Sequence, residues 1–348
     1  MNRKAIGRRS FLSAAGMGLT AAGLSGGLSG CAPASGGAEG KSTVATYIPS
    51  SYGDLYPGIE KFTDVATDRS KGRLSLDMYD SGSLLGAEQL LPGLMGGVAD
   101  IIFQTSSYVS STYPVLGAME LPFVTEDYPK LRRAIAPGSP QHELINKKLK
   151  PKGVRILGGM PTTFEYLWTV DKPIRKPEDV HGMRLRVAGE IEGETVKALG
   201  GAPVTMGSAE IYEAIERGTI DGMMSYVGTV VSRDLQTVIK YGTVGHFGAY
   251  TVDAYCRADW YEQQDPVVRQ ALDAAGRAIY GDGTDNMVKV HTSDYLPKVE
   301  DEGVELIRSD AAGRAAFRKA VAPVYGRWRS HLGDDTAADR AVESIRKA

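Results

Sequence analysis

Two arginines stand in a short apolar segment near the middle of the chain. Alternate side chains of a strand face opposite sides, so a strand over 183–187 places Arg184 and Arg186 on the same face. A buried guanidinium without a partner costs several kcal/mol, and its planar fork matches a carboxylate through two parallel hydrogen bonds. The pattern therefore predicts a carboxylate beside these arginines. That carboxylate belongs either to the protein or to a bound ligand.

Polar and aromatic side chains also mark two other predicted strands. Gln104 and Thr105 follow the apolar run 98–103, at the carboxyl edge of a strand, where α/β proteins bind ligands. In the strand predicted over 164–170, aromatic side chains that include Trp168 alternate with Glu165 and share one face. An aromatic face of this kind forms either a ligand wall or part of the core.

Composition limits the chemistry that the chain can perform. Among its 348 residues, 42% are hydrophobic and 24% are charged, as in soluble globular proteins, and a net charge of -2 argues against binding nucleic acid. Two cysteines and five histidines have no zinc-binding spacing, so we predict neither a metal nor a cofactor. The mature part contains no ordered nucleophile and base, which argues against an enzyme.

The first 40 residues are typical of an export signal. The twin arginine Arg8-Arg9, followed by Phe-Leu, indicates Tat export, and the Gly/Ala-rich stretch after it is too short to remain in a membrane. This stretch ends at Cys31 in a lipobox-like Leu-Ser-Gly-Cys. We predict a signal peptide over 1–30, lipid modification of Cys31 and a flexible tether over 31–41. The alternative is a plain secretory signal in which the cysteine is incidental.

Strand and helix patterns alternate along the rest of the chain. Strands are predicted over 43–48, 74–78, 98–103, 154–157, 164–170, 183–187 and 219–225. Helices are predicted over 56–69, 86–95, 191–199, 208–217, 266–290 (one helix or a pair) and 311–328. This order is typical of an α/β protein, and two similar halves imply a cleft between them.

Several motifs, in this order and spacing, resemble those of TRAP-transporter solute-binding proteins of the dicarboxylate-binding (DctP) type. The main run is Gly182-x-x-x-Arg186-Val187, Ala198-Leu199-Gly200-Gly201-Ala202-Pro203-Val204-x-Met206, Glu210-x-Tyr212-x-Ala214 and Gly218-x-x-Asp221-Gly222. Shorter matches are Gly82-Ser83-Leu84-Leu85-Gly86, Gly97-Val98-Ala99-Asp100-Ile101, Glu120-Leu121-Pro122-Phe123 and Lys172-Pro173-Ile174. The resemblance covers residues 42 to 330.

The resemblance implies a two-lobed, periplasmic-binding-protein-like α/β fold with crossing strands and a long connecting helix. Lobe I is expected to hold 42–163 and roughly 250–288, and lobe II 164–249 and roughly 289–348. The two lobes are expected to close around a ligand by hinge bending.

The resemblance also assigns roles to individual residues. Arg186 matches the arginine that grips the ligand's carboxylate in this family, and Tyr52 and Tyr226 stand where family ligand loops lie. Three positions depart from the family: Glu165 replaces a frequent second arginine, Ser208 replaces an aromatic residue and Ser225 replaces asparagine. The candidate ligand-binding residues are Tyr52, Gln104, Thr105, Glu165, Trp168, Arg186, Ser208, Ser225 and Tyr226.

A glutamate at position 165 repels a second ligand carboxylate and favours an amine or a hydroxyl. We therefore expect a monocarboxylate with hydroxyl or amine groups rather than a dicarboxylate. In the alternative, Glu165 turns to solvent or pairs with Arg184.

The resemblance implies an extracytoplasmic receptor of a TRAP transporter that works with the membrane subunits and is held at the outer face of the cytoplasmic membrane by its lipid. The alternatives are a solute-binding lipoprotein of an ABC-type importer and, as a third hypothesis, a lipid-anchored hydrolase.

Overall fold

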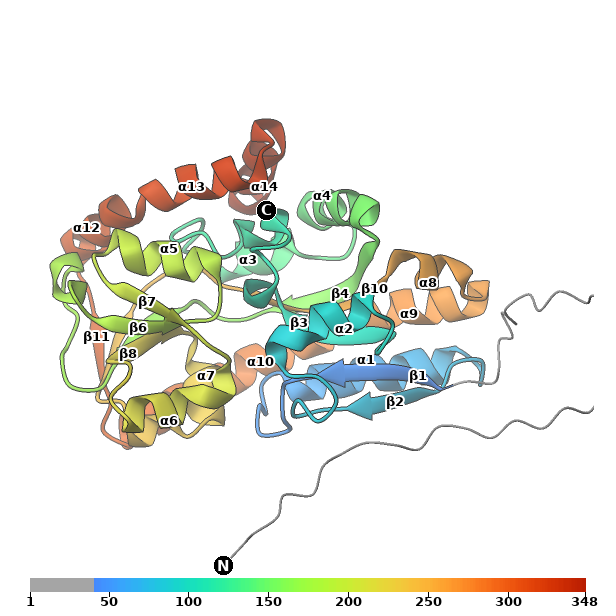
Figure 1. The fold of residues 1–348 in the computed structure, drawn as a ribbon, viewed down its shortest axis with the longest axis horizontal. Helices are drawn as coiled ribbons and strands as arrows, with labels where there is room; N and C mark the ends of the chain where they lie inside the picture. The colour runs from blue at the N-terminus through green and yellow to red at the C-terminus, as the bar shows by residue number, and fades with distance from the viewer. Residues whose placement is uncertain (1–40) are drawn as a thin grey trace, which may run out of the picture. The chain divides into compact units, whose positions relative to one another are not determined.

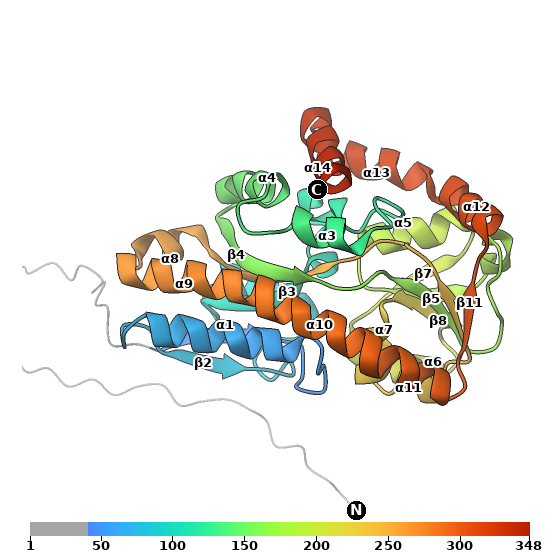
Figure 2. The same cartoon turned by 180° about the vertical axis from the view of Figure 1, so that it is seen from behind.

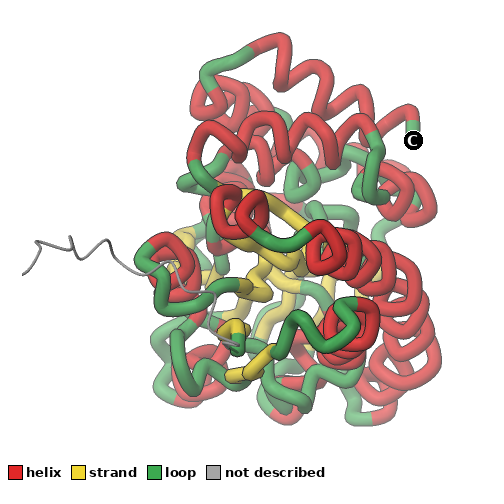
Figure 3. The backbone as a smooth tube through the Cα atoms, turned by 90° about the vertical axis from the view of Figure 1, so that its right-hand side faces the viewer, coloured by secondary structure: helices red, strands yellow, loops and turns green. Residues whose placement is uncertain are grey.

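The computed structural model describes residues 41–348, which contain two β-sheets with helices packed around them (Figures 1 and 3). The first sheet has the order β2-β1-β3-β10-β4, and the second has the order β11-β9-β5-β8-β6-β7. The predicted α/β class with two lobes is confirmed. No helix within residues 41–348 is both long and apolar enough to cross a membrane.

The strands of the first sheet are β1 (Ser42–Thr46), β2 (Leu76–Tyr79), β3 (Ile101–Thr105), β4 (Val154–Pro161) and β10 (Thr251–Arg257). Those of the second sheet are β5 (Tyr166–Thr169), β6 (Arg184–Val187), β7 (Ala202–Thr205), β8 (Gly222–Ser225), β9 (Tyr241–Val244) and β11 (Glu305–Arg308). In each sheet, parallel pairs from βαβ units stand beside antiparallel pairs formed by strands that arrive from the other sheet.

The helices before the long helical run are α1 (Tyr56–Arg69), α2 (Leu90–Met95), α3 (Tyr128–Ala134), α4 (Pro140–Leu149), α5 (Glu190–Ala198), α6 (Ile211–Glu216), α7 (Val227–Ser232) and α8 (Ala258–Gln263). The others are α9 (Pro266–Ala278), α10 (Thr284–Val290), α11 (Leu296–Asp301), α12 (Ala311–Val321), α13 (Pro323–Leu332) and α14 (Asp335–Lys347). Helix α1 has the predicted bounds. Pro57 is favourable in its first turn, and Ile59 and Phe62 lie on its buried face.

Two connections carry the chain between the sheets and lie side by side. One leads from β4 to β5, and the other returns from β9 to β10. The amide of Glu165 donates a hydrogen bond to the carbonyl of Gly248 (2.9 Å), and the amide of Thr162 donates to the carbonyl of Tyr250 (2.9 Å). Glu165 is therefore fixed by its backbone at the point where the chain crosses between the sheets.

A continuous helical run also links the two halves. It passes from α9 through the π-helical segment Ile279–Gly283 into α10, and through a second π-helical segment, His291–Tyr295, into α11 (Figure 2). Its start is capped by Asp265, whose carboxylate accepts from the amide of Val267. Gly276 lies against Gly158 of β4, where a Cβ on either glycine would meet backbone atoms of the facing segment. Because neither Gly158 nor Gly276 has a side chain, the backbone of α9 packs directly against β4.

The C-terminal helices differ from the prediction. The helix predicted over 311–328 is in fact two helices, because Pro323 cannot donate an amide hydrogen bond and begins α13. Helix α14 packs against α3 and α4, beside the first sheet (Figure 1). We propose that the two lobes follow the two sheets. By its contacts, α14 then belongs to the lobe of the first sheet.

Candidate functional site

Arg186 lies on β6 in the interior, with 2% of its surface exposed. Its Nε donates to the carbonyl oxygen of Met206 (3.0 Å), and its Nη2 donates to the hydroxyl of Tyr108 (3.0 Å). Tyr108 ends the 3-10 turn Ser106–Tyr108 directly after β3. A side chain of the second sheet is thus hydrogen-bonded to a side chain that follows a strand of the first sheet, and Arg186 lies at the junction between the halves.

The charge of Arg186 is not neutralised by an ion pair with a carboxylate of residues 41–348. Burial by itself lowers the pKa of this guanidinium, but the nearby hydroxyl of Tyr108 and the carboxyl of Glu192 outweigh that effect and raise it. The side chain therefore stays charged in the interior. The sequence left two kinds of partner open for Arg186, a carboxylate of the protein or a carboxylate of a ligand. Within residues 41–348, the structure provides no carboxylate in direct contact with it.

Arg184, two residues earlier on the same strand, has a different partner. Its Nη2 lies 2.6 Å from Oδ1 of Asp221, and its Nε lies 3.2 Å from Oδ2, so the pair is bidentate and lies at the surface. Asp221 belongs to the motif Gly218-x-x-Asp221-Gly222. The alternative in which Arg184 pairs with Glu165 is therefore wrong.

Glu165 is fully buried, so the alternative in which it turns to solvent is also wrong. The carboxyl group of Glu165 can form a hydrogen bond with that of Glu192 when one of the two is protonated. Its oxygens have no other hydrogen-bond partner within residues 41–348. Burial raises the pKa of Glu165 well above its ordinary value, and the nearby acids Glu192 and Glu120 raise it further, while Arg186 opposes the shift. Its carboxyl group therefore favours the protonated state, in which it can both donate and accept a hydrogen bond.

Two further buried acids share this region. Burial raises the pKa of Glu192, on α5, to about 7, although Arg186 and the amide of Ala188 stabilise its charge. Burial raises the pKa of Glu120 to about 8, and its oxygens accept hydrogen bonds from the hydroxyls of Ser106 (2.8 Å) and Ser110 (3.1 Å). Three buried carboxyl groups thus act electrostatically on one another near a single buried guanidinium.

The first half of the molecule contributes hydroxyl groups to the junction. Tyr108 stacks edge-on against Tyr47, with ring centroids 5.3 Å apart, and the hydroxyl of Tyr47 lies 3.3 Å from that of Thr105. Thr105 ends β3, as predicted. Gln104 precedes it, but its side chain bonds to the carbonyl of Ala87 and to the amide of Thr105 and is occupied within the first half.

Ser208 connects the groups of both halves. Its amide donates to the hydroxyl of Tyr108 (3.0 Å), the same hydroxyl that binds Arg186. Its own hydroxyl accepts from Nη2 of Arg233 (3.1 Å) and lies 3.5 Å from the hydroxyl of Tyr52. The small side chain of Ser208 leaves room for these two groups.

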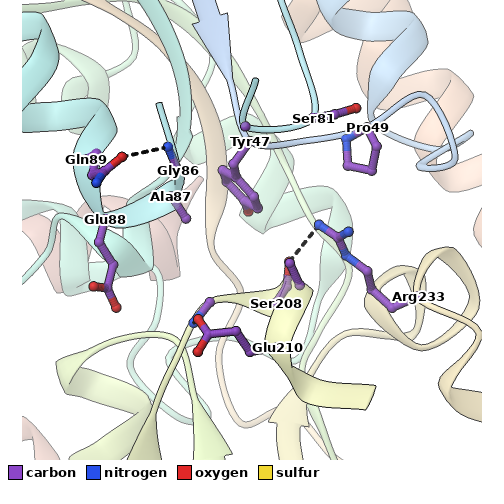
Figure 4. A pocket seen from close by; sticks show the side chains of 13 residues that line it. Tyr47, Pro49, Ser81, Gly86, Ala87, Glu88, Gln89, Ser208, Glu210 and Arg233 are labelled. Atoms are coloured by element: carbon purple, nitrogen blue, oxygen red, sulfur yellow. Dashed lines mark hydrogen bonds between the residues drawn. The ribbon is translucent and has the colours of Figure 1, made fainter. Parts of the chain in front are cut away.

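A cavity of about 380 Å³ opens next to Ser208, within the size range of small-molecule sites (Figure 4). Both halves contribute to its walls. The lining residues are Tyr47, Pro49, Ser81, Gly82, Gly86, Ala87, Glu88, Gln89, Gly207, Ser208, Ala209, Glu210 and Arg233.

The remaining predicted residues lie deeper in the protein. The indole N–H of Trp168 donates to the carbonyl of Ser225 (2.8 Å), and its ring belongs to the hydrophobic core beside the second sheet, so we omit it from the ligand wall. The hydroxyl of Ser225 donates to Thr229 (3.0 Å), and Tyr226 stacks edge-on against Tyr250. Cys31 lies outside the described residues.

Sequence reasoning missed four side chains that the structure brings to this region, namely Tyr47, Tyr108, Glu192 and Arg233. Tyr47 and Tyr108 both follow a strand of the first sheet, and the rule that strand ends face the cleft was available to find them. Glu192 and Arg233 carried no pattern of their own. Within residues 41–348, no three His, Cys, Asp or Glu side chains are grouped to hold a metal ion.

The family model described as "Bacterial extracellular solute-binding protein, family 7" matches residues 47–331. The C4-dicarboxylate-binding periplasmic protein DctP of Rhodobacter capsulatus is 24% identical over 285 residues, which are 81% of this chain and 84% of that protein. A TRAP periplasmic solute-binding protein of Ralstonia eutropha H16 with bound (S)-2-acetolactate is 26% identical, with a TM-score of 0.80 over 88% of this chain and 99% of that one. One from Roseobacter denitrificans with bound β-D-glucuronate is 21% identical, with a TM-score of 0.80 over the same shares.

Proposed function

This chain belongs to family 7 of the bacterial extracellular solute-binding proteins, and from that premise we propose that it captures a small organic acid between its lobes for a TRAP transporter. The observation that carries the proposal is the buried guanidinium of Arg186, which is charged and forms no ion pair with a carboxylate of residues 41–348. A carboxylate supplied by a ligand would complete its fork.

The family consists of solute receptors, which favours binding over catalysis and disfavours the lipid-anchored hydrolase. The match also favours a TRAP system over an ABC-type importer, which was the main alternative. The relatives are named for different acids, so the ligand class has to be argued from this chain's own residues.

We propose a monocarboxylate that carries hydroxyl or amine groups. Glu165 supports this class, because its buried oxygens have no hydrogen-bond partner within residues 41–348 apart from the carboxyl of Glu192, and its pKa is raised by burial and by neighbouring acids. A protonated carboxyl group accepts a hydrogen bond from a hydroxyl, and an ionised one attracts an amine. The pair of Glu165 and Glu192 carries a negative charge once Glu192 ionises, with a pKa of about 7, and a second ligand carboxylate beside the pair would add a like charge.

Thermal unfolding of the mature protein with a panel of organic acids tests the proposal. A ligand at a hundred times its dissociation constant adds about 2.7 kcal/mol to the free energy of unfolding. We expect hydroxy and amino monocarboxylates to raise the midpoint and to be recovered unchanged. Formation of a product from any of them would refute a receptor role.

A charge-neutral variant tests the ligand class separately. We expect Glu165→Gln to weaken binding of amine-bearing acids and to relieve the exclusion of succinate and malate, while Glu216→Gln, an exposed acid on α6, leaves both unchanged. If succinate or malate binds the wild-type protein more tightly than every monocarboxylate does, the proposed class is wrong.

We further propose that the mature chain is held to the membrane by a lipid on Cys31. The lipobox-like sequence and the preceding twin arginine support this, and both lie outside the described residues. Replacement of the cysteine by serine should move the protein from the membrane fraction to the soluble fraction, and retention in the membrane would contradict the proposal.

A further inference from the structure

Arg233 places a second guanidinium in the cleft. It follows the last residue of α7, and its amide donates to the carbonyl of Thr229 (3.2 Å), which fixes the start of the side chain. Nη2 donates to the hydroxyl of Ser208, and the guanidinium carbon lies 5.3 Å from the centre of the Tyr52 ring. The side chain thus spans from the second half of the molecule to the first.

The contacts of Arg233 within residues 41–348 do not use its full donor capacity. Its Nε is buried and has no hydrogen-bond acceptor there, and the side chain forms no ion pair with a carboxylate. A guanidinium has five N–H donors, so Arg233 retains donors for another acceptor. It also lines the cavity of about 380 Å³, where Figure 4 shows it near Tyr47 and Ser208.

The two guanidinium groups are linked by a chain of hydrogen bonds, although only Arg233 is among the residues that line the cavity. Arg186 donates to the hydroxyl of Tyr108, that hydroxyl accepts from the amide of Ser208, and the hydroxyl of Ser208 accepts from Arg233. Arg186 is thus the inner end of this chain of contacts, and Arg233 is the outer end, at the cavity wall.

The charges around the cavity indicate what Arg233 would bind. Glu88 and Glu210 line the same cavity, so a fully anionic group there would meet two carboxylates of the protein as well as one arginine. A neutral acceptor, such as a hydroxyl or a carbonyl oxygen, accepts from the guanidinium without that repulsion. Hydroxyl groups can also donate to the two glutamates.

We propose that Arg233 is a second anchor of the ligand site, which binds the end of the acid that lies away from Arg186. The ligand is then an elongated monocarboxylate with hydroxyl or carbonyl groups at its far end, such as a sugar acid. This inference rests on the proposed function and deepens it, because it adds a length and a second contact to the ligand class.

Calorimetric titration of two groups of acids tests the proposal. The long acids are D-glucuronate, D-galacturonate and 2,3-diketo-L-gulonate, and the short acids are pyroglutamate, 2-acetolactate and pantoate. In Arg233→Gln, we expect affinity for the long acids to fall by about tenfold or more, as for a lost hydrogen bond to a charged group. The short acids should lose less than about threefold, because they do not reach Arg233.

Two further variants keep the result interpretable. Arg233→Lys keeps the charge but loses the planar fork, and it should bind the long acids with an affinity between those of wild type and Arg233→Gln. Arg217→Gln, which removes an exposed arginine directly after α6, should bind both groups as wild type does. If Arg233→Gln does not fold, the ratio of long to short affinities in Arg233→Lys decides the question.

The outcomes separate the two proposals. Binding of the short acids alone, or equal losses for both groups in the Arg233 variants, overturns the role of Arg233 and leaves the receptor function intact. Unchanged affinity for the long acids in the variants also overturns it. If the wild-type protein binds no acid of either group, the proposed function fails together with the inference.

Discussion

Replacement of Arg186 by methionine removes the charge on which ligand capture is expected to depend. Methionine keeps an unbranched apolar stem of similar length, so the strand and its packing are disturbed little. Tyr108 loses one donor, but its hydroxyl still accepts from the amide of Ser208 at 3.0 Å. The variant therefore tests the guanidinium more than the fold.

The expected loss follows from the burial of Arg186, of which 2% is exposed. Removing one partner of a buried, hydrogen-bonded ion pair costs about 3–5 kcal/mol, because the other charge stays buried without compensation. Since about 1.4 kcal/mol corresponds to a tenfold change, the dissociation constant of a bound acid should rise at least about a hundredfold.

Arg184→Met is the matched control. It alters the same residue type two positions away on the same strand, where the guanidinium pairs with Asp221 at the surface. Its affinity for acids should equal that of the wild type. Calorimetric titration measures both variants, and the thermal midpoint without ligand confirms that each is folded.

A loss of less than about tenfold in Arg186→Met would refute the reasoning, because a neutral site would then hold the acid almost as well. An equal loss in both variants would also refute it. In that case the effect would come from β6 as a whole and not from a carboxylate on one guanidinium.

Two predictions concern stability. Burial raises the pKa of Glu120 from 4.5 to about 8, so the folded chain keeps a proton that the unfolded chain releases above pH 4.5. The free energy of unfolding, and with it the thermal midpoint, should therefore fall as the pH rises from 5 to 8. Glu120→Gln should flatten this dependence of the thermal midpoint on pH. An unchanged dependence would exclude Glu120 as its source. In Gly276→Ala the new Cβ would lie 1.9 Å from the carbonyl oxygen of Leu157, and urea unfolding should show a loss of about 1–3 kcal/mol or more. Gly326→Ala, on α13 with no atom from outside the neighbouring helix backbone within 4 Å of its Cβ, should gain about 0.5–1 kcal/mol. Equal effects of the two changes would contradict the close contact of α9 with β4.

The sequence predicted what depends on local pattern. Alternation over 183–187 placed two arginines on one face of a strand, and the structure contains that strand as β6. It did not predict that one of them is exposed and the other buried. That difference arises because Asp221, which lies just before the neighbouring strand β8, holds Arg184 at the surface, and strand order cannot be read from periodicity.

The parts that were missed depend on contacts between distant segments. Arg233 and Tyr52 are far apart in sequence, and they meet only because the two halves pack at the cleft. Glu165 was singled out as a departure from the family, but its full burial follows from the crossing connection, in which its amide donates to the carbonyl of Gly248. A sequence pattern carries neither of these arrangements.

The same contacts bear on the expected closure of the two lobes, which we propose that a ligand favours. The contacts between the halves at the cleft include hydroxyl-mediated bonds of Tyr108, Ser208 and Tyr52, and an ordinary hydrogen bond contributes only about 0.5–1.5 kcal/mol net. Opening the cleft exchanges these bonds for bonds to water at little cost. A ligand carboxylate bound to Arg186 would add a charge-assisted contact. Tyr108, in the other half, positions the guanidinium for that contact only when the two halves are together. On the proposed function, we therefore expect the difference in ligand affinity between a closed and an open arrangement to shift the protein toward the closed one.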